Sequence, residues 1–343
     1  MEGRTVKAPQ SVKTRNFREA LFNNALIIVL CALIVVIAII EPKFLQLRVL
    51  KDILTQASVK LVVACGFLFV LLVGGNDLSA GRQVGLYAVI IASMMQRPDY
   101  PLLFWPDLPA LPIIVPILLA LLVAAICGLL NGYMVSHLKI PPFIATLGMQ
   151  TIVYGACSLY FSMEPNNAQP IGGLRPDVTQ IAKSYLFGEI NVLILIALAV
   201  VLIAGFVLKK TVFGKNVYAV GGNLRAAQIS GINTSKVIFS AYIIESCLLC
   251  FAALLEIART GSATNSYGDG YEFDAISACV VGGVSLSGGI GKVRGAVIGV
   301  LIFTVINYGL AFLGINPNWQ QVIRGLIICV AVTFDVKKNS VKN

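Results

Sequence analysis

Apolar runs long enough to cross a membrane follow one another along almost the whole chain, from residue 22 to residue 334. A helix needs about 20 apolar residues to span the hydrocarbon of a bilayer. Only 12% of the residues are charged, whereas a soluble domain carries about 25%. Because an α-helix satisfies its own backbone groups in lipid, the sequence predicts an all-α polytopic membrane protein.

The length rule predicts about ten transmembrane helices in a single domain, residues 22–334, between tails at 1–21 and 335–343. The helices are expected at residues 22–40, 57–75, 83–96, 113–136, 143–162, 189–208, 237–257, 273–287, 293–313 and 319–334. A short amphipathic piece is expected at 44–54, before the second helix, and an irregular outer loop at 163–188. The sequence therefore describes one membrane domain with short connections.

Charge sets the expected orientation of this domain. Most of the 26 Lys and Arg residues, Arg82 included, fall in segments on the same side as the two termini. Cytoplasmic loops are the ones enriched in these residues, so both termini are predicted to be cytoplasmic. Lys60 and Arg324 lie inside predicted spans, where their side chains are expected to reach toward the outer interface.

The longest polar interval between two such spans is 209–236, which carries five cations and no acid. Asn223 is expected to cap a short helix that Gly231 ends. Leu224, Ala227 and Ile229 would give this helix an apolar face with no core of its own. The interval is either a solvated basic loop or a docking helix for a cytoplasmic partner, and the small Ala226–Ala227 pair favours docking. The candidate docking residues are Asn223, Leu224, Arg225, Ala226, Ala227, Gln228, Ile229, Ser230, Gly231 and Ile232.

Ionisable residues inside spans are costly and mark candidate functional positions. Asp77 is expected either to gate a path or to cap the next helix, and Glu245 lies about two turns into its span. Glu272 and Asp274 are expected to be caps at a helix N-terminus. The candidate path or gate residues, small and mildly polar apart from Asp77, are Asn76, Asp77, Ser79, Asn131, Gln150 and Asn307.

The chain shows no pattern for catalysis or metal binding. The one histidine, His137, has no partner at ligand spacing, and 288–292 lacks the length and hydroxyl of a phosphate-binding loop. All eight cysteines lie in apolar runs, which predicts no disulfide framework. Cys247 and Cys250 have redox spacing but are expected to be structural. The chain is thus expected to be no enzyme, with no catalytic residue and no metal.

Two short segments echo each other. Residues 73–81 and 281–289 share the pattern VGGxxLSxG, each at the inner end of a predicted span. Glycines at such places allow close helix approach or a break in a helix. The echo is either an internal duplication or a convergence on one kind of turn.

Motifs along nearly the whole chain resemble the permease subunits of ATP-binding-cassette importers of the ribose/galactose class. They are 74–85, 128–132, 146–148, 213–216, 219–223, 226–232, 282–289 and 303–309. Segments 261–265, 271–275 and 315–319 are similar to the galactose branch of that class. Loops 98–112 and 163–188 match no motif of the class.

The resemblance implies a type II importer-like fold in a bacterial cytoplasmic (inner) membrane, and a homodimer of this chain. It also implies a separate ATPase subunit that holds ATP and Mg, so no cofactor on this chain, and a periplasmic or lipid-anchored sugar-binding protein. Residues 223–232 would be the coupling helix.

Three functions stay open at this point. The expected one is ATP-driven import of a monosaccharide such as galactose, a methyl-galactoside or glucose. The first alternative is an ion-coupled secondary sugar carrier that depends on Glu245 or Asp77. The second is a membrane scaffold without transport. No interaction with nucleic acid is expected, because membrane topology accounts for the cations.

Overall fold

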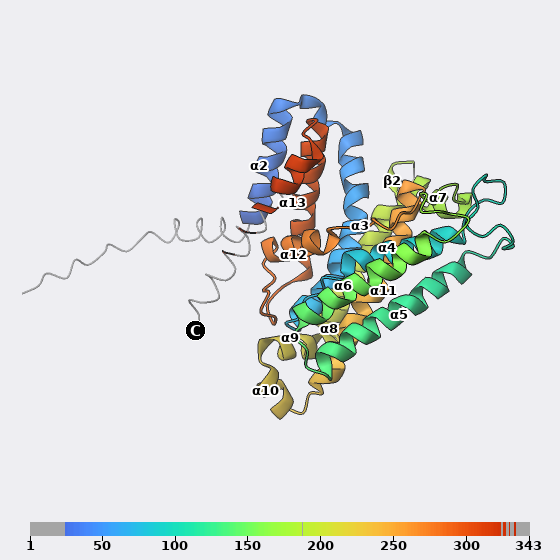
Figure 1. Ribbon diagram of the computed structural model, residues 1–343. Helices are drawn as coiled ribbons and strands as arrows, with labels where there is room; N and C mark the ends of the chain where they lie inside the picture. Colours follow the sequence, from blue (N-terminus) through green and yellow to red (C-terminus); the bar gives the residue numbers. More distant parts are fainter. Residues whose placement is uncertain (1–24, 187, 324, 327–328, 330–332, 334–343) are drawn as a thin grey trace, which may run out of the picture.

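The computed structural model describes residues 25–326, except 187 and 324, together with 329 and 333. The described chain is mostly helical (Figure 1). Its elements are α2 (Ala25–Ile40), η1 (Pro42–Leu45), α3 (Leu47–Leu72), α4 (Ala80–Ser93), α5 (Ile114–Ser136), α6 (Pro142–Phe161), α7 (Pro176–Lys183), β1 (Tyr185–Leu186), β2 (Ile190–Asn191), α8 (Val192–Lys210), α9 (Val212–Gly222), α10 (Leu224–Ile229), α11 (Thr234–Thr260), α12 (Tyr271–Val281) and α13 (Val293–Phe312). The two tails predicted at 1–21 and 335–343 lie outside the described residues.

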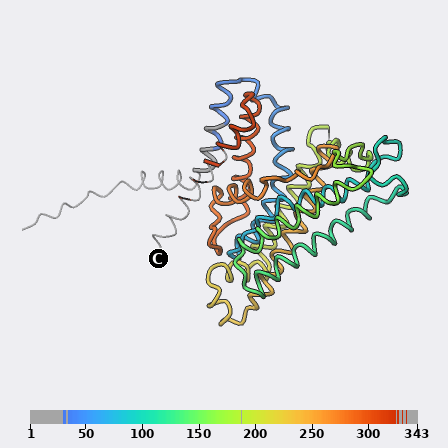
Figure 2. Tube along the Cα trace, in the orientation of Figure 1, coloured from blue at the N-terminus to red at the C-terminus, as the bar shows by residue number. Residues whose placement is uncertain are grey.

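The centre of the bundle is built on α11, which packs against α3, α4 and α5 (Figure 2). Glycines allow these helices to approach closely. A Cβ atom on Gly128 of α5 would lie 2.8 Å from the Cα of Ile243 on α11. Small residues at a helix contact let backbones come together in a membrane, where packing rather than hydrophobic burial holds helices together.

Six described helices are long and apolar enough to cross a membrane, namely α3, α5, α6, α8, α11 and α13. They differ in how much protein surrounds them. In the most apolar stretch of α3, 72% of the residues are buried, against 22% in α8. The bare sides of α5, α6 and α8 carry large apolar side chains such as Leu122, Ile152 and Leu202. These sides suit contact with lipid or with another protein.

Several predicted boundaries are wrong. The amphipathic piece expected at 44–54 belongs mostly to α3, which begins at Leu47 and runs unbroken for 26 residues. The loop expected to be irregular at 163–188 contains α7 and β1. The spans expected at 83–96 and 273–287 are the short helices α4 and α12, of 14 and 11 residues. Neither crosses a bilayer alone. The count of ten stays a prediction, since much of 319–334 is not described.

Connecting segments gather at two ends of the bundle. At one end, Gln96 pairs with Leu174 and Ile171 with Ala263 in isolated β-bridges. These residues lie in or beside segments predicted to be outside. At the other end, the Nζ of Lys139 lies 3.4 Å from the Oγ of Ser235, in segments predicted to be inside. The expected grouping of loops is thus present, and the direction of the bundle in the membrane stays a prediction.

Arg82 departs from this grouping. Its guanidinium lies 2.8 Å from the carboxylate of Asp269, which follows α11 on the side predicted to be outside. The assignments of Arg82 to an inner segment and of Asp269 to an outer one therefore conflict, because the two side chains meet. Residues 264–270 fold back against α4, where the backbone of Gly268 lies against Gly81 and that of Tyr267 against Gly85.

Candidate functional site

The predicted docking helix is present as α10. The side chain of Asn223 caps it by accepting a hydrogen bond from the N–H of Ala226 at 2.9 Å. Its C-terminal end is closed by the N–H of Ile232, which donates to the carbonyl of Ala227 at 3.0 Å. Gly231 has a φ of +82°, a left-handed conformation that costs glycine little. The cap and the stop are both confirmed.

This helix projects from one end of the bundle (Figure 1). Ala227 is the one residue of α10 that is buried, at 4% exposure, and it seats the helix on its own chain. Leu224 is 42% exposed and Ile229 is 88% exposed. Two large apolar side chains in solvent beside a basic stretch form a surface suited to a protein partner.

A further helix, which the sequence analysis did not predict, connects α10 to the bundle. Helix α9 is capped by Thr211, whose side chain accepts from the N–H of Gly214. The hydroxyl of Tyr218 donates to the carbonyl of Gly291 at 2.9 Å, and Phe213 stacks on Phe69 of α3 with ring centroids 6.3 Å apart. Partial burial raises the pKa of Tyr218 further above neutral pH.

The end of α9 packs backbone against backbone on both echoed turns. A Cβ atom on Gly221 would lie 1.8 Å from the carbonyl oxygen of Leu72 and 2.5 Å from the N of Gly289. The N–H of Gly289 itself donates to that carbonyl at 2.9 Å. We call this meeting of 72–75, 221–222 and 288–289 the glycine junction. It joins the docking helix directly to the ends of α3 and of the second turn, beside a cavity of about 290 Å³.

The structure brings three predicted path residues into one buried polar cluster. Asp77, Ser79 and Asn131 are each at most 1% exposed. Asp77 accepts from the N–H of Ser79 at 2.8 Å, from Gln83 at 3.1 Å and from Asn131 at 3.2 Å. The Ser79 bond lies just before α4, whose N-cap is Ser79 itself, so the cap expected of Asp77 is not formed. The bonds from Gln83 and Asn131 join the turn to α4 and α5.

Sequence reasoning missed half of this cluster. Gln83 accepts from Tyr87 at 2.7 Å and lies 2.6 Å from the hydroxyl of Ser246 on α11. The spacing of Ser79, Gln83 and Tyr87, four residues apart, places all three on one face of α4 and was the available signal. Ser246 had no such signal, since a lone serine in an apolar run is common.

Glu245 lies next to this cluster. It is fully buried, and no donor among the described residues reaches either carboxylate oxygen. A buried carboxylate that no donor reaches is costly inside a membrane bundle, so Glu245 marks a candidate functional position.

The other predicted path residues lie apart. The carbonyl of Asn76 accepts from Tyr242 at 3.2 Å beside the cluster. Gln150 lies on α6 and Asn307 on α13. Among the described residues, neither shares a hydrogen bond with the cluster around Asp77, and the amide nitrogen of the buried Asn307 lacks a partner.

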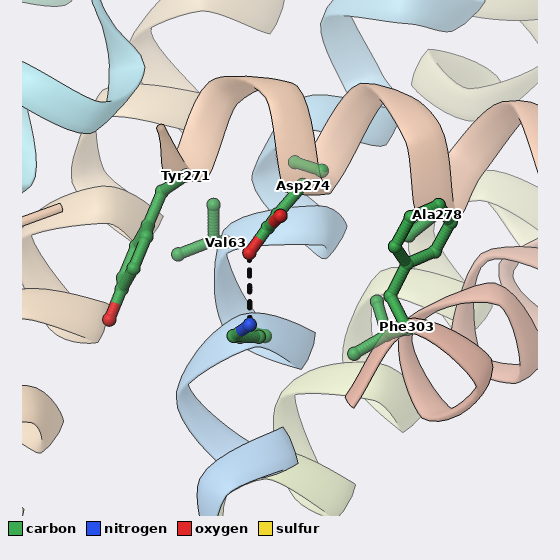
Figure 3. Close-up of a pocket in the computed structure, with 8 residues that line it drawn as sticks. Val63, Tyr271, Asp274, Ala278 and Phe303 are labelled. Atoms are coloured by element: carbon green, nitrogen blue, oxygen red, sulfur yellow. Dashed lines mark hydrogen bonds and ion pairs between the residues drawn. The ribbon is translucent and has the colours of Figure 1, made fainter. Parts of the chain in front are cut away.

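The two acids expected to cap α12 lie buried in its first turn, and the N-cap is Gly270. Asp274 is buried and its carboxylate lies 2.9 Å from the Nζ of Lys60 on α3, between Tyr271 and Phe303 (Figure 3). The prediction that Lys60 reaches toward the interface is therefore wrong, because a carboxylate inside the bundle holds it. Glu272 is 1% exposed and lies against the backbone of Gly81. Each acid helps to join α12 to the α3–α4 region.

Cys247 and Cys250 are free thiols on α11. The described part of the chain contains no group of three or more His, Cys, Asp and Glu side chains placed to hold a metal ion. His137 ends α5, where its ring stacks on Tyr133 with centroids 5.3 Å apart. Its surroundings are those of a packed aromatic residue.

Long apolar helices, two half-length helices inside the bundle and an anchored helix projecting from one end define a multi-pass membrane permease. A family model described as "Branched-chain amino acid transport system / permease component" matches residues 49–332. The chain therefore belongs to this family of permeases. No solved structure matches it.

The curated relatives carry the names of sugar permeases. The chain is 42% identical over 334 residues to the galactose/methyl galactoside import permease protein MglC of Escherichia coli (strain K12), covering 96% of this chain and 98% of the relative. It is 35% identical to the ribose import permease protein RbsC of Bacillus subtilis (strain 168), over 90% and 91% of the two chains. It is 32% identical to the fructose import permease protein FrcC of Rhizobium meliloti, over 90% and 84%. The resemblance seen in the motifs is confirmed.

Proposed function

We propose that this chain is the membrane-spanning subunit of an ATP-binding-cassette importer that carries galactose, a methyl-galactoside or glucose into a bacterial cell. It acts in the cytoplasmic membrane, with both termini inside, as a homodimer. A separate ATPase subunit binds ATP and Mg, and a periplasmic or lipid-anchored protein delivers the sugar. The 42% identity to MglC over nearly the full length supports galactose above ribose or fructose.

The observation that carries the proposal is the seating of the docking helix. Residues 223–232 form a capped helix that exposes Leu224 and Ile229, and its root is held in the glycine junction. Closure of a partner ATPase would push on the exposed side chains. Because Gly221 packs directly on the backbone of Leu72 and Gly289, the push would reach α3 and the second turn without a flexible intermediate. Alternating access then follows from relative movement of these helices.

We further propose that Asn76, Asp77, Ser79, Asn131, Gln150 and Asn307 border or gate the path. The cluster around Asp77 suits a gate more than a sugar contact, because its side chains are sealed inside the bundle. Gln150 on α6 is accessible and suits the wall of a path. A weakly polar path is sufficient where a separate binding protein selects the sugar.

The test is uptake of labelled galactose into proteoliposomes that contain this chain, its ATPase and the binding protein, with and without ATP. We expect uptake to need ATP and all three proteins. An Ile229→Asp variant should lose uptake, because a charge replaces the exposed apolar contact. Ile190→Asp, at an exposed apolar residue beside the outer-end loops, is the matched control and should transport normally.

The buried pair of Asp77 and Glu245 favours one alternative, an ion-coupled sugar carrier. Such acids inside a bundle are the usual sites of proton coupling. That function predicts uptake by this chain alone, driven by an ion gradient and lost in Glu245→Gln. Uptake without ATP under these conditions would replace the importer proposal.

A further inference from the structure

One group of charged and polar side chains faces outward from the middle of the bundle. The depth follows from α11, whose 27 residues span about 40 Å at 1.5 Å per residue. Ser246, near the middle of α11, contacts Gln83 at 2.6 Å, and Arg82 is the neighbour of Gln83. Arg82 therefore lies near the centre of a hydrocarbon layer about 30 Å thick.

Five residues form this midmembrane patch: Arg82 on α4, Tyr154 and Ser158 on α6, and Asn265 and Asp269 before α12. The guanidinium of Arg82 lies 2.8 Å from Asp269 and 4.6 Å from the centroid of the Tyr154 ring. Asn265 donates to the hydroxyl of Ser158 at 3.2 Å. Three separate segments thus converge on one surface.

The patch is open where the protein would otherwise meet lipid. The side chain of Asp269 is 60% exposed, and Tyr154 is 44% exposed. A carboxylate at this depth is costly in hydrocarbon and faces water or protein in membrane structures. The side of the bundle that carries Arg82, Tyr154 and Asp269 therefore faces water or another protein rather than the bilayer.

The chemistry of the patch matches a sugar. Asp269 presents acceptors for sugar hydroxyls, while Arg82 and Asn265 present donors. The face of Tyr154 offers an apolar plane for the C–H side of the ring. Gln150 lies four residues before Tyr154 on α6, on the same face, and extends the polar surface along the helix axis.

We propose that Arg82, Tyr154, Ser158, Asn265 and Asp269 form a sugar-contact site at the middle of the translocation path. This inference rests on the proposed function, because it names the place where the transported sugar touches this chain. The site is shallow, with one exposed acid and one aromatic face, so it holds the sugar weakly. Weak contact suits a transport path, since a tightly held sugar would leave slowly.

Uptake of labelled galactose by the complete transporter tests the site. We expect Asp269→Asn and Tyr154→Leu each to lower the uptake rate roughly tenfold, because a hydrogen bond to a charged group and a ring contact are lost. Asp99→Asn is the control for the acid, since Asp99 is an exposed partner of Arg97 in a loop. Tyr133→Leu is the control for the aromatic, as it is 49% exposed on α5. Both controls should transport at the wild-type rate.

A second measurement needs no transport. Ser266 is exposed beside the patch, so a Ser266→Cys variant should react with a membrane-impermeant maleimide above the background of the native chain. Galactose-loaded binding protein with ATP should slow that reaction.

The outcomes separate the two proposals. If the wild type shows no ATP-driven uptake, the importer function fails while labelling at position 266 still reports water at the patch. If the wild type transports and Asp269→Asn transports equally well, the contact site is wrong. If Asp269→Asn does not fold, the maleimide reaction decides. A Ser266→Cys variant that does not react with the maleimide overturns the site, whereas a reaction slowed by galactose-loaded binding protein and ATP supports it.

Discussion

The two glycine-rich turns, 73–81 and 281–289, each contain a backbone hydrogen bond to the residue five positions earlier, and this bond lies one pattern position later in the second turn. At the end of α3, the N–H of Gly75 donates to Val70, and at the end of α12 the N–H of Val284 donates to Cys279, each at 2.9 Å. A side chain then closes each turn. Asp77 accepts from the N–H of Ser79 at 2.8 Å, and Ser285 accepts from that of Ser287 at 3.2 Å.

The turns differ in the chemical group of the closing side chain and in the helices that each turn contacts. Asp77 carries a carboxyl group that also accepts from Gln83 and Asn131, so the first turn is tied to α4 and α5. Ser285 is neutral, and the second turn connects to the glycine junction through backbone contacts. A shared pattern therefore makes one turn a polar anchor inside the bundle and the other a backbone support for the docking helix.

Among the variants proposed here, one that disrupts the glycine junction should lower the free energy of unfolding most. Gly221→Val would place side-chain atoms where the carbonyl of Leu72 lies, so we expect a loss of about 3 kcal/mol or more in the free energy of unfolding. Thermal unfolding of the purified protein in detergent measures it. Gly222→Ala, the next residue of α9, meets no atom within 4 Å and serves as the control. Equal stability of Gly221→Val and Gly222→Ala would show that the close packing of Gly221 does not stabilise the protein.

Removing the ion pair between the two helices that precede the turns comes next. Lys60→Met withdraws the cation from Asp274, whose side chain is 7% exposed, and should cost about 3 kcal/mol. Adding Asp274→Asn should recover part of that loss, because a buried carboxylate is no longer left without its cation. A double variant that is less stable than Lys60→Met alone would contradict this account.

The closing side chains themselves provide a direct comparison. Asp77→Ala leaves buried donors on Ser79, Gln83 and Asn131 without their acceptor and should cost about 2 kcal/mol. Ser285→Ala removes a neutral acceptor and should cost about 1 kcal/mol. Melting temperatures of the two variants, measured side by side, should fall in that order. The reverse order would show that the second turn is the stronger anchor.

The smallest change in stability is expected far from both turns, at the exposed ion pair of Lys51 and Glu189. Lys51 donates to the carboxylate and lowers the pKa of Glu189 through this hydrogen bond and its charge. A carboxyl group with a lowered pKa in the folded state adds stability above its ordinary pKa. That stability is lost as the pH falls through the lowered value. Glu189→Gln should therefore lower the melting temperature slightly at neutral pH and not in acid, and added salt should remove the difference.

The sequence was sufficient for features that depend on neighbours along the chain. Apolar run length predicted the long helices α5, α6, α8 and α13 to within a few residues, because crossing a bilayer requires a minimum length. Asn223 and Gly231 predicted the short helix α10, since capping is local hydrogen bonding and backbone geometry. The motifs predicted the family.

Only the tertiary structure decided which polar residues meet. Lys60 and Asp274 are 214 positions apart, and no local pattern indicated that they pair. The short helices α4 and α12 lie in apolar stretches, so their composition alone does not distinguish them from helices that cross the bilayer. How α4, α9 and α12 pack in three dimensions decides that Gly221 lies on Leu72 and that Arg82 and Asp269 face outward. The same packing gives the two copies of the echoed pattern different surroundings.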